Sequence, residues 1–162
     1  MYEDVIGVAA VECGYTGGET SDPDYRSVCK GDTGHAEAVR LTYDPDVISY
    51  DELLDIFFHV HDPTQLNRQG NDIGTQYRSA IFPHDERQRA AAEAAIGRAQ
   101  AAHSQPVVTA IEPLGNWHQA EIEHQDYWAR KGSRNPYCLA VIPPKLRKLR
   151  KDFAARLKTE QA

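Results

Sequence analysis

The stretch "AEAVRLTYDPDVISYDELLDIFFHV" (Ala36–Val60) changes from a strand pattern to a helix pattern. The side chains of residues 36–44 alternate between two sets along the chain. In a strand every second side chain points to the same side, so this period of two is the pattern of a strand. We therefore predict a strand over residues 36–44. One face of it would carry Glu37, Val39, Leu41 and Tyr43.

A helix with a well-defined start follows this strand. Ser49 is followed three residues later by Glu52, which is the pattern of a capping box. Behind this start, apolar side chains recur on one side at Leu53, Phe57 and Val60. A strand that leads directly into a helix indicates a fold in which helices cover a sheet.

Further patterns of the same two kinds lie on both sides of this pair. Upstream, the valine-rich segment Val5–Tyr15 predicts a buried strand that ends in the turn residues "TGG". Downstream, residues 77–82 ("YRSAIF") predict a strand, residues 85–103 an alanine-rich helix, and residues 106–113 ("PVVTAIEP") another strand. This order favours an α+β fold, an α/β sandwich with helices packed on a mixed sheet.

The C-terminal part predicts a long coil followed by an amphipathic helix. Residues 114–144 show no clear order, and we expect coil with one helical turn around residues 120–127. Residues 145–162 carry a net charge of +5 above a helical stripe of apolar side chains, which predicts a helix docked on the body. Because the rest of the chain has a net charge of −11, we do not expect nucleic-acid binding. The stripe consists of Leu146, Leu149, Phe153 and Leu157.

Length and composition indicate one folded domain over residues 1–162. The hydrophobic fraction of 41% and the charged fraction of 26% are ordinary for a globular protein. No apolar run approaches the ~18 residues of a membrane span, and no secretory signal pattern follows Met1. We expect a cytoplasmic monomer with no membrane partner.

The histidines and cysteines do not form a recognisable metal-binding motif. His59 and His61 stand two residues apart at the end of a predicted helix, where their side chains would face apart. Cys13 falls within the first strand and is predicted to be a small buried residue. Cys29 follows a polar turn, where an exposed unreactive thiol is favoured over a reactive one, and for Cys138 the sequence favours neither.

The segment "RQGNDIGTQYRSA" (Arg68–Ala80) is too polar for a core and too patterned for a simple connection. It combines two glycines with Asp72 and Tyr77 and leads into an apolar segment. Long loops of such composition commonly carry binding or catalytic residues. We therefore predict that this loop belongs to a ligand site.

Three longer motifs together resemble one protein family. They span Gly14–Pro45 ("GYTGGETSDPDYRSVCKGDTGHAEAVRLTYDP"), Phe57–Phe82 ("FFHVHDPTQLNRQGNDIGTQYRSAIF") and Glu123–Cys138 ("EHQDYWARKGSRNPYC"). In order and spacing they look like the A-type methionine sulfoxide reductases, the peptide-methionine (S)-S-oxide reductases. The resemblance covers essentially the whole chain, and "GDTGHAEAV" and "QGNDIGTQYRSAI" are its most specific parts. It implies that the sandwich has a ferredoxin-like core.

The resemblance implies the reaction and its partners. A cysteine thiolate attacks the sulfoxide sulfur, methionine departs, and the enzyme is left as a sulfenic acid. A second cysteine then closes a disulfide, which thioredoxin reduces. The implied substrates are free methionine sulfoxide and oxidised proteins, and the implied role is protein repair under oxidative stress with no bound cofactor or metal.

The resemblance also implies the residues of the site. Glu37 lies on the apolar side of its predicted strand, where desolvation would raise its pKa, so we expect it to be the proton donor. The alternative is that Glu37 only caps the preceding turn. Cys138 is implied as the resolving thiol. The residues implied to surround the substrate are Tyr25, Glu37, Asp72, Tyr77 and His124.

Within that set the residue types suggest separate tasks. Tyr25 and Tyr77 would orient the sulfoxide oxygen, because a phenol is a good hydrogen-bond donor. Asp72 would fix its loop or hold a water molecule. These roles are expectations from the resemblance and from side-chain chemistry.

The sequence departs from the family pattern at its start. The family's catalytic cysteine stands in a Gly-Cys-Phe-Trp element upstream of the segment that matches Val5–Tyr15, and the printed chain contains no Phe-Trp pair. We therefore expect an N-terminally truncated domain that lacks the first strand of the fold, shows a bare sheet edge and is inactive by itself. Two interpretations remain open: a longer reading frame that encodes an ordinary reductase, or a shortened, inactive relative that acts as a sulfoxide- or peptide-binding module. A weaker third idea is that Cys29 or Cys13 replaces the nucleophile.

Overall fold

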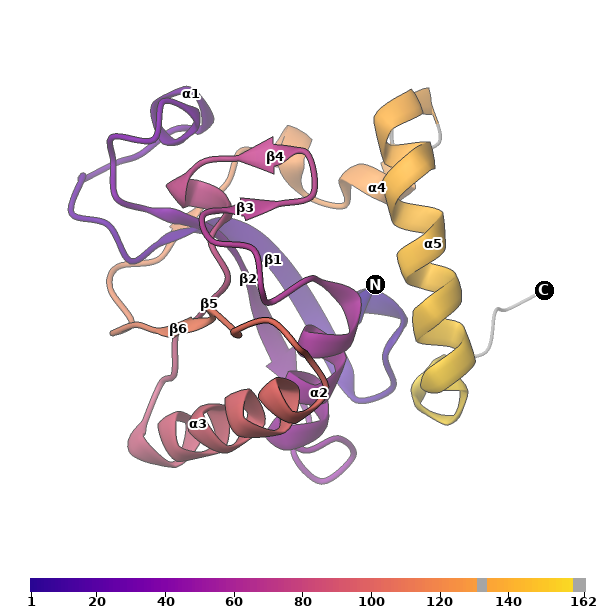
Figure 1. Cartoon of the computed structure of the whole chain (residues 1–162). Helices are drawn as coiled ribbons and strands as arrows, with labels where there is room; N and C mark the ends of the chain where they lie inside the picture. Colours follow the sequence, from indigo (N-terminus) through magenta and orange to yellow (C-terminus); the bar gives the residue numbers. More distant parts are fainter. Residues whose placement is uncertain (131–133, 159–162) are drawn as a thin grey trace.

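The central feature of the fold is a three-stranded antiparallel sheet of order β2-β1-β7, of which Figure 1 labels β1 and β2. The computed structural model describes residues 1–130 and 134–158. β1 (Val8–Thr16) and β2 (Ala36–Tyr43) pair along their whole length, and β7 (His118–Gln119) pairs with the far end of β1. Both strands predicted in the N-terminal part of the chain are thereby confirmed.

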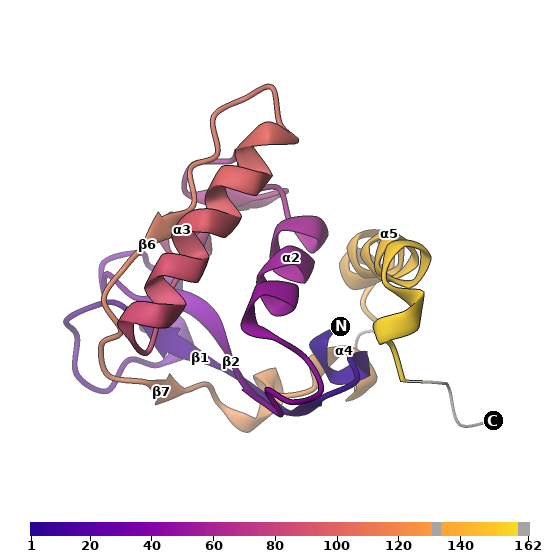
Figure 2. The same cartoon turned by 90° about the horizontal axis from the view of Figure 1, so that it is seen from below.

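Two helices cover one face of this sheet (Figure 2). α2 (Tyr50–Val60) begins at Ser49, whose side chain accepts a hydrogen bond from the Glu52 amide while the Glu52 carboxylate accepts one from the Ser49 amide. The predicted capping box is therefore confirmed. α3 (Glu86–Ala101) packs beside α2 through buried alanines, whose small side chains allow a close approach.

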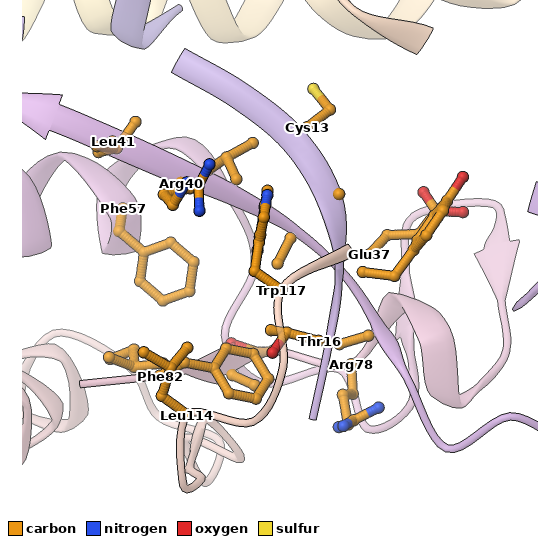
Figure 3. A pocket seen from close by; sticks show the side chains of 18 of the residues that line it. Cys13, Thr16, Glu37, Arg40, Leu41, Phe57, Arg78, Phe82, Leu114 and Trp117 are labelled. Carbon is orange, nitrogen blue, oxygen red and sulfur yellow. The ribbon is translucent and has the colours of Figure 1, made fainter. Parts of the chain in front are cut away.

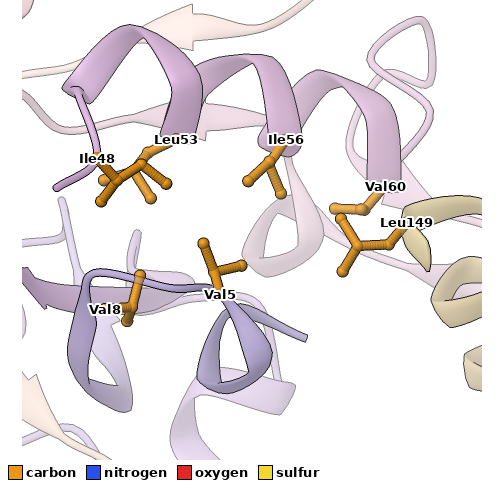
Figure 4. Close-up of a cluster of buried hydrophobic side chains, with 7 residues drawn as sticks. All are labelled: Val5, Val8, Ile48, Leu53, Ile56, Val60 and Leu149. Carbon is orange, nitrogen blue, oxygen red and sulfur yellow. The ribbon is translucent and has the colours of Figure 1, made fainter. Parts of the chain in front are cut away.

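The main core lies between β1, α2 and the C-terminal helix α5 (Pro136–Asp152), as Figure 4 shows. Apolar side chains from the short helix η1 (Tyr2–Asp4) and from η5 (Ala154–Arg156) with its flanking residues close its rim. Removing this apolar surface from water is the dominant stabilising contribution. The buried members are Val5, Val8, Ile48, Leu53, Ile56, Val60 and Leu149.

The C-terminal helix confirms one prediction and corrects another. Leu149 is fully buried against α2, so the predicted helix does dock on the body. It ends at Asp152, so Phe153 and Leu157 pack on the core from beyond the helix, and the helix expected to continue after residue 152 is wrong for the residues described there. However, α5 begins at Pro136, so the coil expected up to residue 144 is wrong over residues 136–144. The helix accommodates Pro143 and Pro144 although each lacks a backbone donor, because packing of its stripe outweighs that local loss.

Between the sheet and α5 the chain forms two short helical turns. η3 (Ile122–His124) confirms the helical turn expected around residues 120–127, and α4 (Tyr127–Arg130) extends it. Within the described residues, no helix is both long and apolar enough to cross a lipid bilayer.

Two predicted strands are much shorter than expected. The segments 77–82 and 106–113 contribute only β5 (Ala80–Ile81) and β6 (Ala110–Ile111), which form a separate parallel pair. Among the described strands, β2 pairs only with β1, so its other edge is bare, as expected from the sequence. Consecutive residues of β2 border a cavity, and β5 lines the same cavity.

Candidate active site

The site is a cavity of about 830 Å³ that extends from β2 to β5. Figure 3 shows that aromatic and aliphatic side chains gather at one end of it, while Glu37 stands at the other. The apolar end is formed by Phe57, Phe82, Leu114 and Trp117. All five residues predicted to surround the substrate line this cavity: Tyr25, Glu37, Asp72, Tyr77 and His124.

Tyr25 begins a short helix, α1 (Tyr25–Cys29), that the sequence analysis described only as a polar turn. Asp24 caps this helix, since its side chain accepts a hydrogen bond from the Ser27 amide at 2.7 Å and the Ser27 hydroxyl accepts one from the Asp24 amide. The cap fixes where the helix starts and therefore where Tyr25 stands.

Asp72 and Tyr77 are presented by the glycine-rich loop. The loop folds into a small hairpin of β3 (Arg68–Gln69) and β4 (Asp72–Ile73), followed by the turn η2 (Thr75–Tyr77). Gly74 links hairpin and turn at φ +148, and a Cβ there would lie 2.2 Å from the Gln76 Oε1 atom. Only glycine fits this position without a shift, so the loop's sequence encodes the placing of both side chains.

A buried histidine holds the start of β2. The Gly18 amide donates to His35 Nδ1 at 3.1 Å, which leaves Nε2 to donate to the Thr20 carbonyl at 2.9 Å. His35, two residues before Glu37, therefore fastens the loop after β1 to the start of β2. A Cβ on Gly18 would come within 2.4 Å of the His35 backbone nitrogen, so this contact also requires glycine.

Arg78 joins three parts of the site. Its guanidinium donates to both Glu112 oxygens, at 2.7 Å from Nε and 2.8 Å from Nη2, and it also donates to the Thr75 and Gly34 carbonyls. The planar fork of arginine suits this paired contact, which the point charge of lysine cannot reproduce. Arg78 thus fixes Tyr77, its neighbour in the chain, against the loop that precedes Glu37.

We expect Arg78→Lys to lower the free energy of unfolding by about 1–2 kcal/mol, because a lysine loses the paired contact and part of the carbonyl contacts. Urea unfolding measures this change. Arg89→Lys is the matched control, since Arg89 is 43% exposed and forms an ion pair with Glu93 on its own helix, and it should change stability by less than about 0.5 kcal/mol. Equal stability of both variants would contradict the role of Arg78.

The electrostatics of the polar end favour neutral, proton-donating groups. Desolvation, together with the neighbouring charge of Asp72, raises the pKa of Glu37 to about 7. The pKa of Tyr77 is raised by desolvation and by the charge of Glu37. Glu37 is exposed, so the expectation that its side chain is buried is wrong. The expected rise of its pKa is nevertheless found.

Comparisons with known proteins agree on one family. The family model "Peptide methionine sulfoxide reductase" matches residues 1–157. The chain belongs to the peptide methionine sulfoxide reductase family. "Peptide methionine sulfoxide reductase MsrA" of Erwinia tasmaniensis is 60% identical over 155 residues, which are 96% of this chain and 87% of that protein.

Solved structures show the same likeness for this reductase. "Methionine sulfoxide reductase A of Corynebacterium diphtheriae" superposes with a TM-score of 0.68 and 40% identity, and the match covers 76% of this chain and 64% of that chain. The yeast protein Mxr1, in a crystal structure titled as a complex with Trx2, matches with a TM-score of 0.51 and 26% identity over 75% of this chain and 67% of that one. Thiol-dependent reduction of methionine sulfoxide is the activity of this family.

The reductase places Cys29, the weaker of the expected alternatives for a reactive thiol, beside Tyr25. Cys29 ends α1 four residues after Tyr25, so both side chains lie on one face of the helix. A hydrogen bond with the Cys29 side chain, together with desolvation, raises the pKa of Tyr25 to about 12. The spacing of four residues was a signal for this contact, but it has meaning only once the helix is known.

The other two cysteines of the reductase occupy different places. Cys13 lines the cavity from β1 and is half-buried, and burial raises the pKa of its thiol. Cys138 lies in the first turn of α5, where its amide donates to Asn135 Oδ1, and it is not among the residues that line the cavity. Its role as the resolving thiol remains a prediction.

The two histidines at the end of α2 make separate structural contacts. His61 joins the Phe57 carbonyl at 2.6 Å and the Ser79 hydroxyl at 2.7 Å, and burial lowers its pKa. His59 contacts Asp152 of α5 at 2.7 Å. Within residues 1–130 and 134–158, no group of three or more His, Cys, Asp or Glu side chains is arranged to hold a metal ion.

Proposed function

We propose that Glu37 is the proton donor for sulfoxide reduction and that Tyr25 and Tyr77 orient the sulfoxide oxygen. The observation that carries this proposal is that Glu37, Tyr25 and Tyr77 line one cavity. Desolvation, together with the charge of Asp72, raises the pKa of Glu37 to about 7. Such a carboxyl is protonated in a large fraction of molecules at neutral pH and can give its proton to a leaving oxygen. Asp72 helps to keep Glu37 protonated through its negative charge.

The reaction balances with thiols as the only reductants. A thiol and a sulfoxide give a sulfenic acid and a thioether, with the oxygen transferred to the attacking sulfur. A resolving thiol then displaces water from the sulfenic acid to form a disulfide, which an external dithiol reduces. By resemblance the attacking thiol belongs to a Gly-Cys-Phe-Trp element, which residues 1–162 do not include.

Thioredoxin is the proposed reductant, and no bound metal or organic cofactor takes part. The support is the yeast relative Mxr1, whose structure is titled as a complex with Trx2. The proposed substrates are methionine-S-sulfoxide, free or in oxidised proteins. We place the enzyme in the cytoplasm, since its three cysteines are unpaired, as is usual in a reducing compartment. We also propose that it acts as a monomer.

Binding and reduction of separate sulfoxide epimers test this function. Titration of the chain with N-acetyl-methionine-S-sulfoxide should shift the NMR signals of Tyr25, Glu37 and Tyr77, whereas the R epimer should shift them much less. A version of the chain extended at its N-terminus by a Gly-Cys-Phe-Trp element should release methionine from the S epimer with dithiothreitol. Equal binding and reduction of both epimers would refute the proposed specificity.

The pH dependence of the reaction follows from Glu37. Because the pKa is raised to about 7, the donor form is lost as the pH rises through that value, and kcat/KM should fall above it. The contribution of the raised Glu37 pKa to folding stability changes in the same direction with pH. It is fully present below pH 4.5 and is lost as the pH rises through about 7. Stopped assays between pH 5.5 and 8.5 measure the falling limb.

Asp72→Asn provides the internal control for this limb. Removing the Asp72 charge lowers the pKa of Glu37, so the falling limb should move to lower pH, while desolvation keeps part of the shift. If the falling limb stays at the same pH in Asp72→Asn and is still present in Glu37→Gln, a group other than Glu37 causes it.

A further inference from the structure

Tyr25 is a half-exposed side chain on a very short helix. It is 42% exposed and is the first of the five residues of α1. A helix of this length has little stability of its own, so contacts from outside α1 help to set the direction of the Tyr25 ring, in addition to its hydrogen bond with Cys29 at the end of α1. Those contacts come from residues 120–125, which follow β7.

Glu121 connects Tyr25 to the sheet with both of its carboxylate oxygens. Oε1 accepts a hydrogen bond from the Tyr25 amide at 2.7 Å, and Oε2 accepts one from the Tyr15 hydroxyl at 2.9 Å. Tyr15 lies in β1 and is 2% exposed, so it is a rigid anchor. One carboxylate therefore fixes the first residue of α1 to the central strand.

The ring of Tyr25 has a second contact from the same segment. The His124 ring stacks on it with centroids 4.3 Å apart and an interplanar angle of 27°. Glu121 thus holds the backbone of Tyr25 while His124 holds its ring. Together they leave the phenol little freedom to turn within the cavity.

The segment that carries these two residues is itself fastened to β1. The Ala120 amide donates to the Cys13 carbonyl at 2.9 Å. The Gln125 side chain then continues the ladder, since its Oε1 accepts from the Cys13 amide at 2.8 Å and its Nε2 donates to the Cys13 and Ala120 carbonyls. A side-chain amide here takes the place of the next backbone pair, so residues 120–125 form a fixed support.

The charge state of Glu121 suits an anchor. Desolvation acts to raise its pKa, but the hydrogen bonds from the Tyr25 amide and the Tyr15 hydroxyl outweigh it and lower the pKa below the ordinary value. Glu121 is therefore ionised at neutral pH and accepts both hydrogen bonds, whereas Glu37 in the same site has a pKa of about 7. The two glutamates differ in their tasks because their surroundings differ.

We propose that Glu121 is a positioning residue for sulfoxide reduction, which fixes the Tyr25 phenol against β1 so that its hydroxyl meets the sulfoxide oxygen. This inference rests on the proposed role of Tyr25. Glu121 does not touch the substrate. Its effect passes through Tyr25, so its loss should reduce kcat more than it raises KM.

A double-mutant cycle with Tyr25 tests the proposal in the chain extended by the Gly-Cys-Phe-Trp element. Glu121→Ala should lower single-turnover kcat about 10- to 100-fold, the scale expected when an orienting group is misplaced by about 1 Å. In the Tyr25→Phe background the same change should cost less than about twofold, because no hydroxyl remains to be placed. Glu123→Ala, which removes an exposed carboxylate from the same turn, should leave kcat unchanged.

Three further readouts keep a structural defect apart from a positioning effect. Glu121→Gln, which retains an acceptor for the Tyr25 amide, should recover most of the activity. Tyr15→Phe removes only the second hydrogen bond and should cause an intermediate loss. In NMR spectra of the 162-residue chain, the Tyr25 ring signals should lose the shift caused by the His124 ring in Glu121→Ala but not in Glu123→Ala.

The possible failures of the two proposals differ. If Tyr25→Phe has full activity, the role of Tyr25 is wrong, and the role of Glu121 is wrong with it. If Tyr25→Phe is impaired but Glu121→Ala costs the same factor in both backgrounds, Glu121 acts on overall structure, and only the inference about Glu121 is overturned.

Discussion

Replacing Glu37 by glutamine is expected to slow methionine-S-sulfoxide reduction by about 10²–10⁴, the range for loss of a positioned general acid. Glutamine has nearly the same shape and still donates a hydrogen bond, but it has no proton to transfer. Substrate affinity should therefore change much less than the rate. Single-turnover formation of sulfenic acid in the chain extended by the Gly-Cys-Phe-Trp element measures the effect directly.

The size of this effect follows from the chemistry of the leaving oxygen. A sulfoxide oxygen accepts hydrogen bonds well but leaves poorly unless it receives a proton. Tyr25 and Tyr77 have raised pKa values, so they stay protonated as hydrogen-bond donors and are weak acids. Glu37, with a pKa of about 7, is the group in this cluster whose acidity matches neutral pH.

A matched control separates this loss from a general effect of removing a carboxylate. Glu93→Gln changes a glutamate that is 60% exposed on α3, and it should react at the unmutated rate. An unmutated rate of sulfenic acid formation in Glu37→Gln itself would show that another group gives the proton.

The parts of the fold that the sequence predicted well are those in which local pattern and packing agree. Alternation over residues 36–44 became β2, and the pair Ser49 and Glu52 became the capping box of α2. The glycine loop could be predicted as a site because Gly74 has a conformation that only glycine adopts readily. In each case the signal lies within a few residues of its consequence.

The parts that the sequence did not predict depend on distant contacts. The segment around Ile81 is apolar enough for a full strand, yet only Ala80 and Ile81 pair, because among the described strands their one partner is the equally short β6. α5 continues through Pro143 and Pro144 because Leu149 is buried in the core, a contact about 90 residues from its partner Val60 in the chain.

The site shows the same division. Tyr25, Glu37, Asp72, Tyr77 and His124 were expected from the family resemblance, and all five line one cavity. Glu121 was not expected, because its two hydrogen-bond partners, Tyr15 and Tyr25, are about 100 residues away in the chain. A residue that acts by joining distant segments has no local pattern that could reveal it.

Cys138→Ser is expected to abolish thioredoxin-driven turnover while leaving the first reduction intact. The variant should release one methionine per enzyme molecule and then stop as the sulfenic acid, because no second thiol closes the disulfide that thioredoxin reduces. The expected time course is a burst of methionine equal to the enzyme concentration, followed by no further release with thioredoxin. Cys13→Ser should not produce it, since the thiol of Cys13 is held on β1 with a raised pKa.

The structure sets a physical condition on this outcome. Disulfide formation brings two Cα atoms to within about 4.4–6.8 Å, and Cys138 is not among the cavity's lining residues, so the first turn of α5 must approach the site during each cycle. Cys29 is not a lining residue either, but it contacts Tyr25, which lines the cavity, so Cys29 requires no movement of α5. The opposite result has two parts: Cys138→Ser turns over fully with thioredoxin, and Cys29→Ser stops after a single-turnover burst. In that case Cys29 is the resolving thiol, and no movement of α5 is required.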